Sequence, residues 1–556
     1  MSPSPINGPT DRRQFLTAMT GLLAAAGAAG AQVPTFGDAD ASPPKELESP
    51  GGLDPLEESS RQRRRADARH VRDRATKDQY RERFPEPKPN GDERRYGHLI
   101  GSFSKSLPHN RIGHVHLRVY RAFYDALARG DVGAIEALPI GPVGLVGPQS
   151  SLAYHLEGGD AWSFFMPPAP AFASAEEAGE MVELYWHALA RDVPFNRYGE
   201  TDLTMAAADD LSALSRFRGP KREGRVTPQT LFRGPTPGDL AGPYISQFLL
   251  LPVPYGSIPM DQKLQTTAPG IDYATDDAEW LRLQNGQGPS VEQIYDPEHR
   301  YIRNGRDMAE WVHRDFLSQL GLSAALILMG MGAPLNRTNP YRRYRRQAPF
   351  VTFGGPDVVN TLTRVANAAM KAAWFQKWFV HRRLRPEEFA GRVQNSLLHK
   401  ARYPIHRELF DSLGLPEHVR IHSTALLSQA YAEACPSHPA YPSGHATFAG
   451  ACVTALKALF DESFELPNPV VASDDGFSLA PWTGEPLTVG GELNKLAANI
   501  AIGRDFAGIH WRSDGVEGMK LGEEVAISVL RDLKQTYHEP FEGFRFKRFN
   551  GKTATI

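Results

Sequence analysis

The 556-residue chain has few cysteines and almost no net charge. Two cysteines, Cys435 and Cys452, cannot make a disulfide framework or a four-thiolate metal site, although in an oxidising compartment they can pair with each other. Lys and Arg number 62 against 64 acidic residues, and the net charge of −2 gives no bulk attraction for nucleic acid or an anionic membrane. Any anion site must therefore be built locally.

Long apolar runs are also missing after the N-terminus. None reaches the roughly 18 residues that a membrane span needs, so we expect no integral membrane protein. Near the N-terminus, Arg12 and Arg13 precede an Ala- and Gly-rich stretch that ends in the small-residue pattern Ala29-Gly30-Ala31. Residues 1–31 resemble a bacterial twin-arginine signal peptide, with a disordered Ala-rich tail as the alternative. A true signal predicts export of the folded protein to the periplasm or the medium.

The composition is otherwise that of a globular protein with ample material for a core, since 41% of the residues are hydrophobic. Residues 32–95 are dense in charge and proline and predict a linker, or an arm that contacts a neighbouring subunit. Residues 96–556 carry apolar residues at spacings of three and four, which predict helices and a mainly α fold. The clearest stripes are Ile112, Val115, Val119, Phe123 and Leu127; Leu362, Val365, Ala369 and Ala373; and Val516, Met519, Ala526, Val529 and Leu533.

Three separated segments contain residues of the types that bind anions. The first runs from Lys377 to Pro386. On one continuous helix, eight residues at about 100° each bring Arg385 to within about 80° of Lys377, so both cations would lean toward one ligand. Pro386 disfavours helical geometry at Arg385 and predicts the end of that helix. A basic helix end that complements its own dipole is the alternative interpretation.

The second segment is Pro442-Ser443-Gly444-His445, directly before a helical pattern over 446–459. A helix start exposes backbone N–H groups and the positive end of the helix dipole, and the Ser443 hydroxyl adds a donor, so an oxyanion fits there. Ser443 can equally be a simple N-cap. His445 would place a titratable group against an anion bound at this position.

The third segment contains Arg504 and His510. Six residues at about 100° put these side chains on different faces of an unbroken helix, so a shared target requires a break, which Gly508 can supply. Ser513 or Asp514 would then cap the next helix, and Asp514 is a candidate hydrogen-bond partner for the imidazole. A structural histidine at a helix junction is the alternative.

In this order the segments match Lys-x7-Arg-Pro, Pro-Ser-Gly-His and Arg-x5-His-x3-Asp. This pattern resembles the vanadium-dependent haloperoxidases and the phosphatases that share their anion site. The flanks Asn336 to Tyr341 and Gly491 to Ala497 resemble the algal and bacterial bromoperoxidases in particular. Gly503 stands where many of the phosphatases have Ser. The resemblance extends over roughly residues 249–515.

The resemblance implies an α-helical protein of two four-helix bundles, with a vanadate site at the mouth of one bundle and a homo-oligomeric assembly. His510 would bind the vanadium. The vanadate oxygens would be held by Lys377, Arg385, Arg504, Ser443 and the N–H of Gly444.

The resemblance also assigns the chemistry. His445 would be the acid and base, and Lys377 would polarise the peroxide. Hydrogen peroxide would oxidise bromide or iodide to hypohalous acid, which halogenates a small organic substrate. His438 and Trp374 would form the halide pocket. Because chloroperoxidases carry Phe at the position of His438, bromide and iodide are the expected halides, with weak or no oxidation of chloride.

Two other functions use the same residues. An acid phosphatase would use His510 as nucleophile and His445 to protonate the leaving group. A non-catalytic periplasmic protein would bind the oxyanion and turn nothing over. The length of the chain, the flanking sequences and His438 favour the peroxidase, and two histidines placed to titrate argue against a simple binding protein.

Export through a twin-arginine signal predicts a mature chain that starts near Gln32. Mass spectrometry of the exported protein from its native host would locate this start. Replacing both Arg12 and Arg13 with Lys should abolish export, whereas the same change at Arg63 and Arg64 should not. Exported protein that retains Met1 would contradict the prediction.

Overall fold

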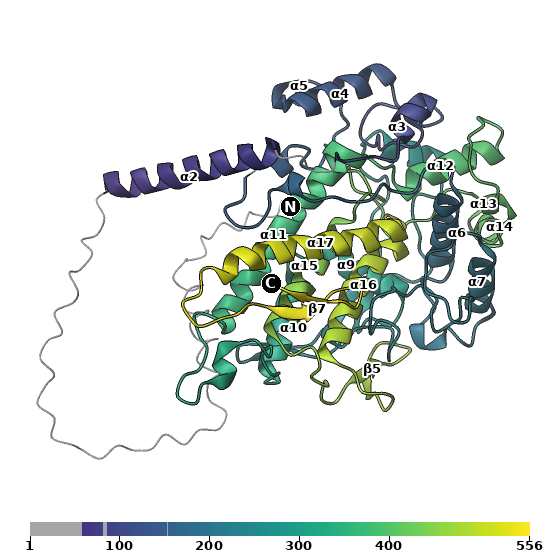
Figure 1. The fold of residues 1–556 in the computed structure, drawn as a ribbon. Helices are drawn as coiled ribbons and strands as arrows, with labels where there is room; N and C mark the ends of the chain where they lie inside the picture. Colours follow the sequence, from purple (N-terminus) through teal and green to yellow (C-terminus); the bar gives the residue numbers. More distant parts are fainter. Residues whose placement is uncertain (1–57, 82–85, 153) are drawn as a thin grey trace, which may run out of the picture.

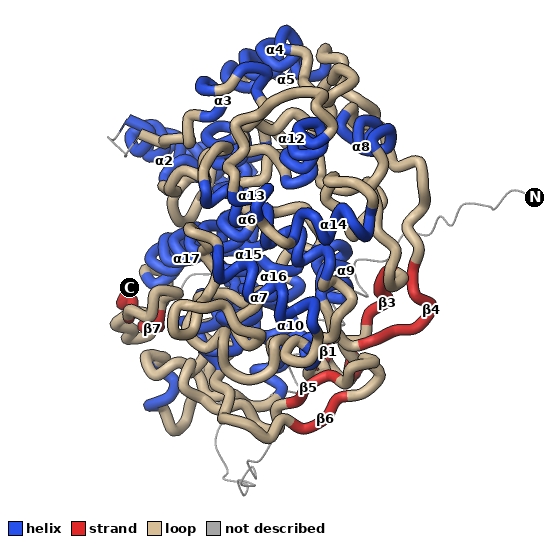
Figure 2. Tube along the Cα trace, turned by 90° about the vertical axis from the view of Figure 1, so that its right-hand side faces the viewer, coloured by secondary structure: helices blue, strands red, loops and turns tan. Residues whose placement is uncertain are grey.

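The computed structural model describes residues 58–81, 86–152 and 154–556, and the expected signal segment lies outside these ranges. The described chain is mainly helical, which confirms the expected fold class (Figures 1 and 2). Its strands form two-stranded antiparallel sheets: β1 (Val253–Tyr255) with β2 (Ile258–Met260), β3 (Leu264–Thr267) with β4 (Tyr295–Arg300), β5 (Val470–Ala472) with β6 (Leu479–Pro481), and β7 (Arg545–Lys547) with β8 (Thr553–Thr555).

A four-helix bundle forms the centre of the molecule. It consists of α11 (Gly355–Phe375), α15 (Gly444–Leu459), α16 (Val489–Phe506) and α17 (Arg512–Lys534). Helix α15 is buried along almost its whole length and contacts the other three. It approaches α17 very closely. A side-chain carbon added at Gly522 of α17 would lie only 1.9 Å from the carbonyl oxygen of Thr447 in α15. Small residues therefore let the two backbones touch.

The four bundle helices meet the candidate site at one end of the bundle. Helices α11 and α16 end there, and α15 and α17 begin there. Hydrogen bonds tie these ends together: the N–H of Ser443, before α15, donates to the carbonyl of Asp514 in α17 at 2.9 Å. The apolar stripe predicted within α11 is confirmed as a buried face, and so is the one within α17 except for Val516, which is only partly buried.

A second group of helices packs around this bundle. Helix α6 (Ala175–Leu189) contacts α7 (Asp202–Ala213), α13 (Glu408–Asp411), α14 (Gly414–His422) and α16. Helices α9 (Gly305–Arg314) and α10 (Gln319–Gly330) cover α16, α15 and α11. The remaining α-helices are α2 (Glu58–Arg81), α3 (Asp92–Arg95), α4 (Leu117–Arg129), α5 (Val132–Glu136), α8 (Asp277–Gln284) and α12 (Pro386–Leu397). No helix in the described ranges is both long and apolar enough to cross a membrane.

The first predicted apolar stripe is only partly helical. Helix α4 begins at Leu117, so Ile112 and Val115 precede it. Residues 109–115 form a turn closed by a bridge between His109 and Val115. Gly113 in this turn has φ 72°, a left-handed conformation that continues no helix. The spacing of the apolar residues therefore extended the predicted helix too far toward the N-terminus.

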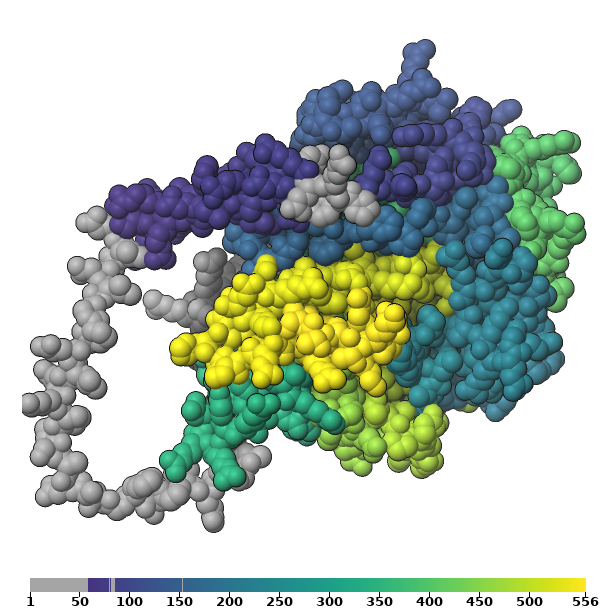
Figure 3. Space-filling model, viewed as in Figure 1, coloured from purple at the N-terminus to yellow at the C-terminus, as the bar shows by residue number. Residues whose placement is uncertain are grey.

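The charged segment before Tyr96 contains the long helix α2, which projects from the body (Figures 1 and 3). Its 24 residues include no Gly or Pro, which is compatible with a helix despite the lack of an apolar face. Side-chain contacts hold its C-terminal half to the body, among them Arg72 to Asp160 and Gln79 to Ser163.

The packed body begins before the predicted boundary at residue 95. Asp92 is buried and accepts a hydrogen bond from the N–H of Phe172 at 2.8 Å. Glu93 forms an ion pair with Arg382 at 2.7 Å. The partners of both acidic residues are distant in sequence. Local composition cannot reveal such contacts, and it therefore predicted a linker there.

Candidate active site

Lys377 and Arg385 lie together, but not on one helix as the spacing predicted. After α11 the chain makes a π-helical turn over Gln376–His381, and it leaves the helix at Arg382, where φ is 42°. Arg385 is extended (φ −84°, ψ 157°) directly before Pro386, as expected from the effect of proline on the preceding residue. A reversal of the chain therefore brings the two cations together.

Both cations bind the loop that precedes α15. Lys377 Nζ donates to the carbonyl oxygens of Pro439 and Ala440 at 2.8 and 2.9 Å. Arg385 Nε donates to the carbonyl of His438 at 2.9 Å. These partners are neutral, so the hydrogen bonds position the cations without cancelling their charge.

Ser443 and Gly444 form the start of α15. Ser443 is the N-cap, and its Oγ accepts a long hydrogen bond of 3.4 Å from the N–H of Ala446. A side-chain carbon at Gly444 would lie 2.9 Å from the ring of Trp374, so only glycine fits between helix and ring. The N-cap interpretation of Ser443 is correct, and the loop just before this helix start is the one that binds Lys377 and Arg385.

His445 lies on the first turn of α15 and is partly exposed. Its Nε2 is 2.8 Å from Oδ1 of the buried Asp315. Burial and the nearby Arg504 lower the pKa of His445, whereas Asp315 raises it. The sequence offered no signal for Asp315, which is a single acidic residue in the turn between α9 and α10.

Arg504 and His510 come together through the predicted helix break. Helix α16 ends at Phe506, and Gly508 adopts the left-handed conformation with φ 82°. The N-cap of α17 is Trp511, and neither Ser513 nor Asp514 takes that place. Asp514 instead accepts the N–H of Trp511 through its carboxylate at 3.1 Å.

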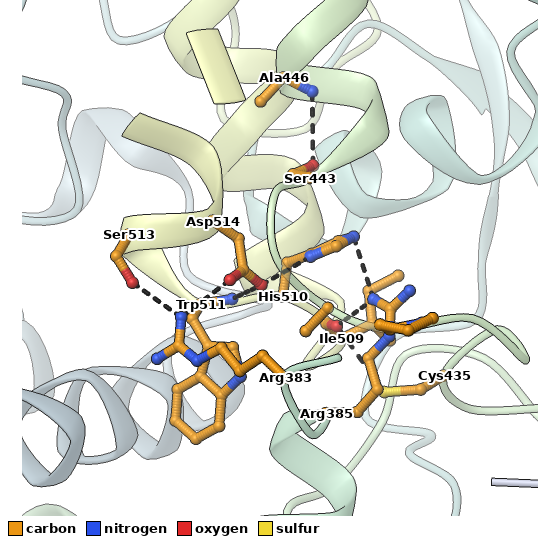
Figure 4. A network of polar contacts seen from close by, with 12 residues as sticks. Arg383, Arg385, Cys435, Ser443, Ala446, Ile509, His510, Trp511, Ser513 and Asp514 are labelled. Carbon is orange, nitrogen blue, oxygen red and sulfur yellow. Dashed lines mark hydrogen bonds and ion pairs between the residues drawn. The ribbon is translucent and has the colours of Figure 1, made fainter. Parts of the chain in front are cut away.

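The contacts of His510 define which ring nitrogen carries the proton (Figure 4). Nδ1 is 2.8 Å from Oδ2 of Asp514, and Nε2 is 3.0 Å from Nη1 of Arg385. A guanidinium only donates, so Nε2 must be the acceptor and Nδ1 must carry the hydrogen. Burial, followed by Arg385, lowers the pKa of His510 far below its usual value. The ring is a neutral imidazole with its Nε2 lone pair on the cation side, which suits a metal ligand.

Three buried cations at this site have no carboxylate partner. Lys377, Arg385 and Arg504 are at most 7% exposed, and within the described part of the chain none of them forms an ion pair. Arg504 Nη1 donates to the Val312 carbonyl at 2.5 Å, and its Nε has no partner. Burial, then the charge of Arg385, lowers the pKa of Lys377 far below normal. Because unpaired buried charge is costly, the site fits an oxyanion.

The two predicted halide-pocket residues are in contact. The rings of Trp374 and His438 have centroids 4.8 Å apart, and Lys377 Nζ is 5.7 Å from the Trp374 ring. His438 Nδ1 is 2.9 Å from Nη2 of Arg385. Burial and Arg385 lower the pKa of His438 far below normal, so this ring acts at neutral pH as a hydrogen-bonding group and not as a charge.

The two cysteines do not form a disulfide and are both buried. Cys435 Sγ lies 3.8 Å from the Ile509 carbonyl, at the edge of the site. Cys452 lies within α15, where its Sγ is 4.0 Å from the carbonyl of Leu362 in α11.

A helical bundle whose end brings together three unpaired cations and a neutral imidazole defines the class of this protein. Residues 359–539 match the family model described as the VCPO second helical-bundle domain. The chain is 37% identical over 485 residues to a vanadium-dependent bromoperoxidase of Ascophyllum nodosum, which covers 82% of this chain and 86% of the relative. It is 35% identical over 546 residues to one of Corallina pilulifera, with coverages of 82% and 91%.

A solved structure agrees with these relatives. The homohexameric structure of the second vanadate-dependent bromoperoxidase from Ascophyllum nodosum superimposes with a TM-score of 0.81, at 28% identity and over 94% of each chain. The chain belongs to the vanadium-dependent bromoperoxidase family.

The unpaired cations predict that tetrahedral oxyanions stabilise the fold. Phosphate at 100 times its Kd should add about 2.7 kcal/mol to the free energy of unfolding and raise the unfolding temperature. Lys377→Met should raise that temperature without phosphate, because it removes a buried amino group that has no carboxylate partner, and should weaken the response to phosphate. Differential scanning calorimetry measures both effects.

Lys457→Met is the matched control for this prediction. Lys457 is equally buried, but it bonds to Asn494 near the opposite end of α15. This variant should respond to phosphate like the unmodified protein. A Lys377→Met variant with an undiminished response would contradict the assigned site.

Proposed function

We propose that this chain oxidises bromide and iodide with hydrogen peroxide, using vanadate held by the residues at the end of the bundle. The observation that carries the proposal is the set of three buried, unpaired cations at the Nε2 of His510, which accepts a hydrogen bond from one of them, Arg385. The names of its relatives in the same family support vanadate as the cofactor.

The donor set suits vanadate. His510 Nε2 would bind the metal, because it is the neutral nitrogen with a lone pair toward the cations. The oxygens would be held by Lys377, Arg385, Arg504, the Ser443 hydroxyl and the Gly444 N–H at the start of α15. When bound, vanadate supplies a Lewis acid that activates hydrogen peroxide for halide oxidation.

His445 would move the protons of the reaction. Its Nε2–H donates to the Asp315 carboxylate, which leaves the lone pair on Nδ1 to accept a proton from hydrogen peroxide. The overall reaction, H2O2 + Br− + H+ → HOBr + H2O, consumes one proton for each turnover. Because His445 is partly exposed, it can exchange that proton with solvent.

Substrates would enter beside Trp374 and His445, the two partly exposed members of the predicted site. Lys377 would orient the peroxide, and the halide would lie against the rings of Trp374 and His438. The hypohalous acid would then halogenate a small organic substrate.

An acid phosphatase is the alternative function, because the same groups would hold phosphate. The bromoperoxidase relatives and the paired rings of His438 and Trp374 favour the peroxidase.

Assembly and export are further parts of the proposal. A homo-oligomer is supported by the homohexameric relative and by the projecting helix α2, and export rests on the residue pattern of 1–31 alone.

The test of the function is a bromination assay on apo protein titrated first with vanadate and then with phosphate. Activity should appear with vanadate and fall with excess phosphate, because both oxyanions compete for the same cations. His510→Ala should retain weak vanadate binding without useful turnover. His445→Ala should bind nearly normally and lose about 10²–10⁴ in turnover.

Three outcomes would count against these roles. Full bromination by vanadium-free protein would exclude a vanadate enzyme. Hydrolysis of a generic phosphomonoester that vanadate inhibits would favour the phosphatase. Equal vanadate affinities of the His510→Ala and His445→Ala variants would show that the two histidines have been given the wrong roles.

A further prediction concerns halide choice. His438→Phe should raise chloride turnover relative to bromide. The phenyl ring cannot donate a hydrogen bond to the peroxide and excludes water from the site, and a peroxide without that hydrogen bond would be a stronger oxidant. Steady-state halogenation with each halide at matched pH measures the preference. The control is His381→Phe, which replaces another buried imidazole of lowered pKa outside the predicted halide pocket. An unchanged preference in His438→Phe would contradict the assignment.

A further inference from the structure

Arg383 is a buried arginine that takes no part in the cation cluster. It lies two residues before Arg385 and is 1% exposed. Its Nη1 donates to Ser513 Oγ and Asp514 Oδ1, both at 2.8 Å (Figure 4). Asp514 therefore lies between Arg383 and His510, so Arg383 can act on the imidazole only through this carboxylate.

The other side of the Arg383 guanidinium is held by helix α6. Nη2 donates to Glu177 and, at 3.1 Å, to Glu180 Oε2. Glu180 also accepts the Ser513 N–H at 3.2 Å and its hydroxyl at 2.8 Å. The guanidinium stacks over the Trp511 ring at 4.7 Å. Arg383 is thus clamped between α6 and the first turn of α17.

This clamp fixes the direction of the Asp514 carboxylate. Oδ1 accepts from Arg383, and Oδ2 accepts from His510 Nδ1 at 2.8 Å and from the Trp511 N–H at 3.1 Å. Since the carboxylate is planar, holding Oδ1 fixes where Oδ2 points, and the Nδ1–H bond then fixes the plane of the imidazole. The direction of the Nε2 lone pair follows from that plane.

We propose that Arg383 is a positioning residue for His510 and acts through Asp514. Glu177 and Glu180 of α6 hold its guanidinium in place. The inference rests on the proposed function, because it assumes that His510 binds vanadate. It assigns to the α6 carboxylates a purpose beyond packing: they orient the arginine that orients the ligand.

The same two helices contain a matched pair that serves as a control. Arg512 is also buried at the start of α17, and its Nε donates to Glu183 of α6 at 2.7 Å. Its Nη1 donates to the Arg233 carbonyl at 2.9 Å. Within the described residues, Arg512 donates to Glu183 and to the Arg233 carbonyl, and it forms no hydrogen bond with Asp514. Loss of Arg512 therefore weakens the contact between α6 and α17 without releasing the carboxylate that holds His510.

The test compares Arg383→Gln, Arg383→Lys and Arg512→Gln with the unmodified protein. Equilibrium dialysis of the full-length apo proteins gives the Kd for vanadate, and calorimetry gives the unfolding temperature. Arg383→Gln should weaken vanadate binding by about 10–100-fold, the usual effect of losing a partner of a metal ligand. Arg383→Lys should show an intermediate loss, because one ammonium cannot span Asp514 and both glutamates. Arg512→Gln should lower the unfolding temperature similarly and keep its Kd within about twofold.

Each outcome has one meaning. A Kd of Arg383→Gln within twofold of the unmodified protein overturns the inference, as does an equal loss in Arg512→Gln. If Arg383→Gln does not fold, Arg383→Lys decides by the same twofold limit. An unmodified protein that binds no vanadate contradicts the proposed function itself, whereas strong binding in every variant contradicts only the role of Arg383.

Discussion

The structure of the site depends on three buried cations whose charge no protein carboxylate cancels. Lys377, Arg385 and Arg504 bind only carbonyl oxygens and imidazole nitrogens in the described chain. The nearby carboxylates of Asp315 and Asp514 are instead bonded to His445 and His510. Each carboxylate is bonded to an imidazole and not to one of these three cations, so the positive field remains available to a ligand anion.

The fold uses buried arginine in two opposite ways within a few residues. Arg383 and Arg512 are bonded to carboxylates of α6 and strengthen the packing of that helix against α17. Arg385 is just as buried but has only neutral partners. An unpaired arginine destabilises the ligand-free protein, and the extensive packing of the bundle around α15 offsets that cost. The contrast separates the arginines whose charge is paired with carboxylates from the one whose charge stays available to an anion.

The parts of the site that the sequence predicted are those set by short-range rules. The helix start at Ser443, the break at Gly508 and the extended Arg385 before Pro386 follow from capping, left-handed glycine and the effect of proline. The π-helical turn after α11 was missed because it has no periodic signature. Asp315 and the Arg383 clamp were missed because their partners lie more than a hundred residues away, and neither composition nor spacing encodes such contacts.

The three histidines of the site have different neighbours, and these decide whether each can take up a proton. Burial and the cations lower the pKa of His438, His445 and His510, so all three are neutral at pH 7 in the anion-free protein. An anion bound among the cations would offset their charge, and that would raise the pKa of the nearby imidazoles. His510 cannot respond by taking a proton, because its Nδ1 is already protonated toward Asp514 and its Nε2 would bind the metal. His445 is partly exposed and has a carboxylate partner that favours its protonated form. Under the proposed function, anion binding would therefore favour proton uptake at His445, from which a proton could be delivered to the reaction and replaced from solvent.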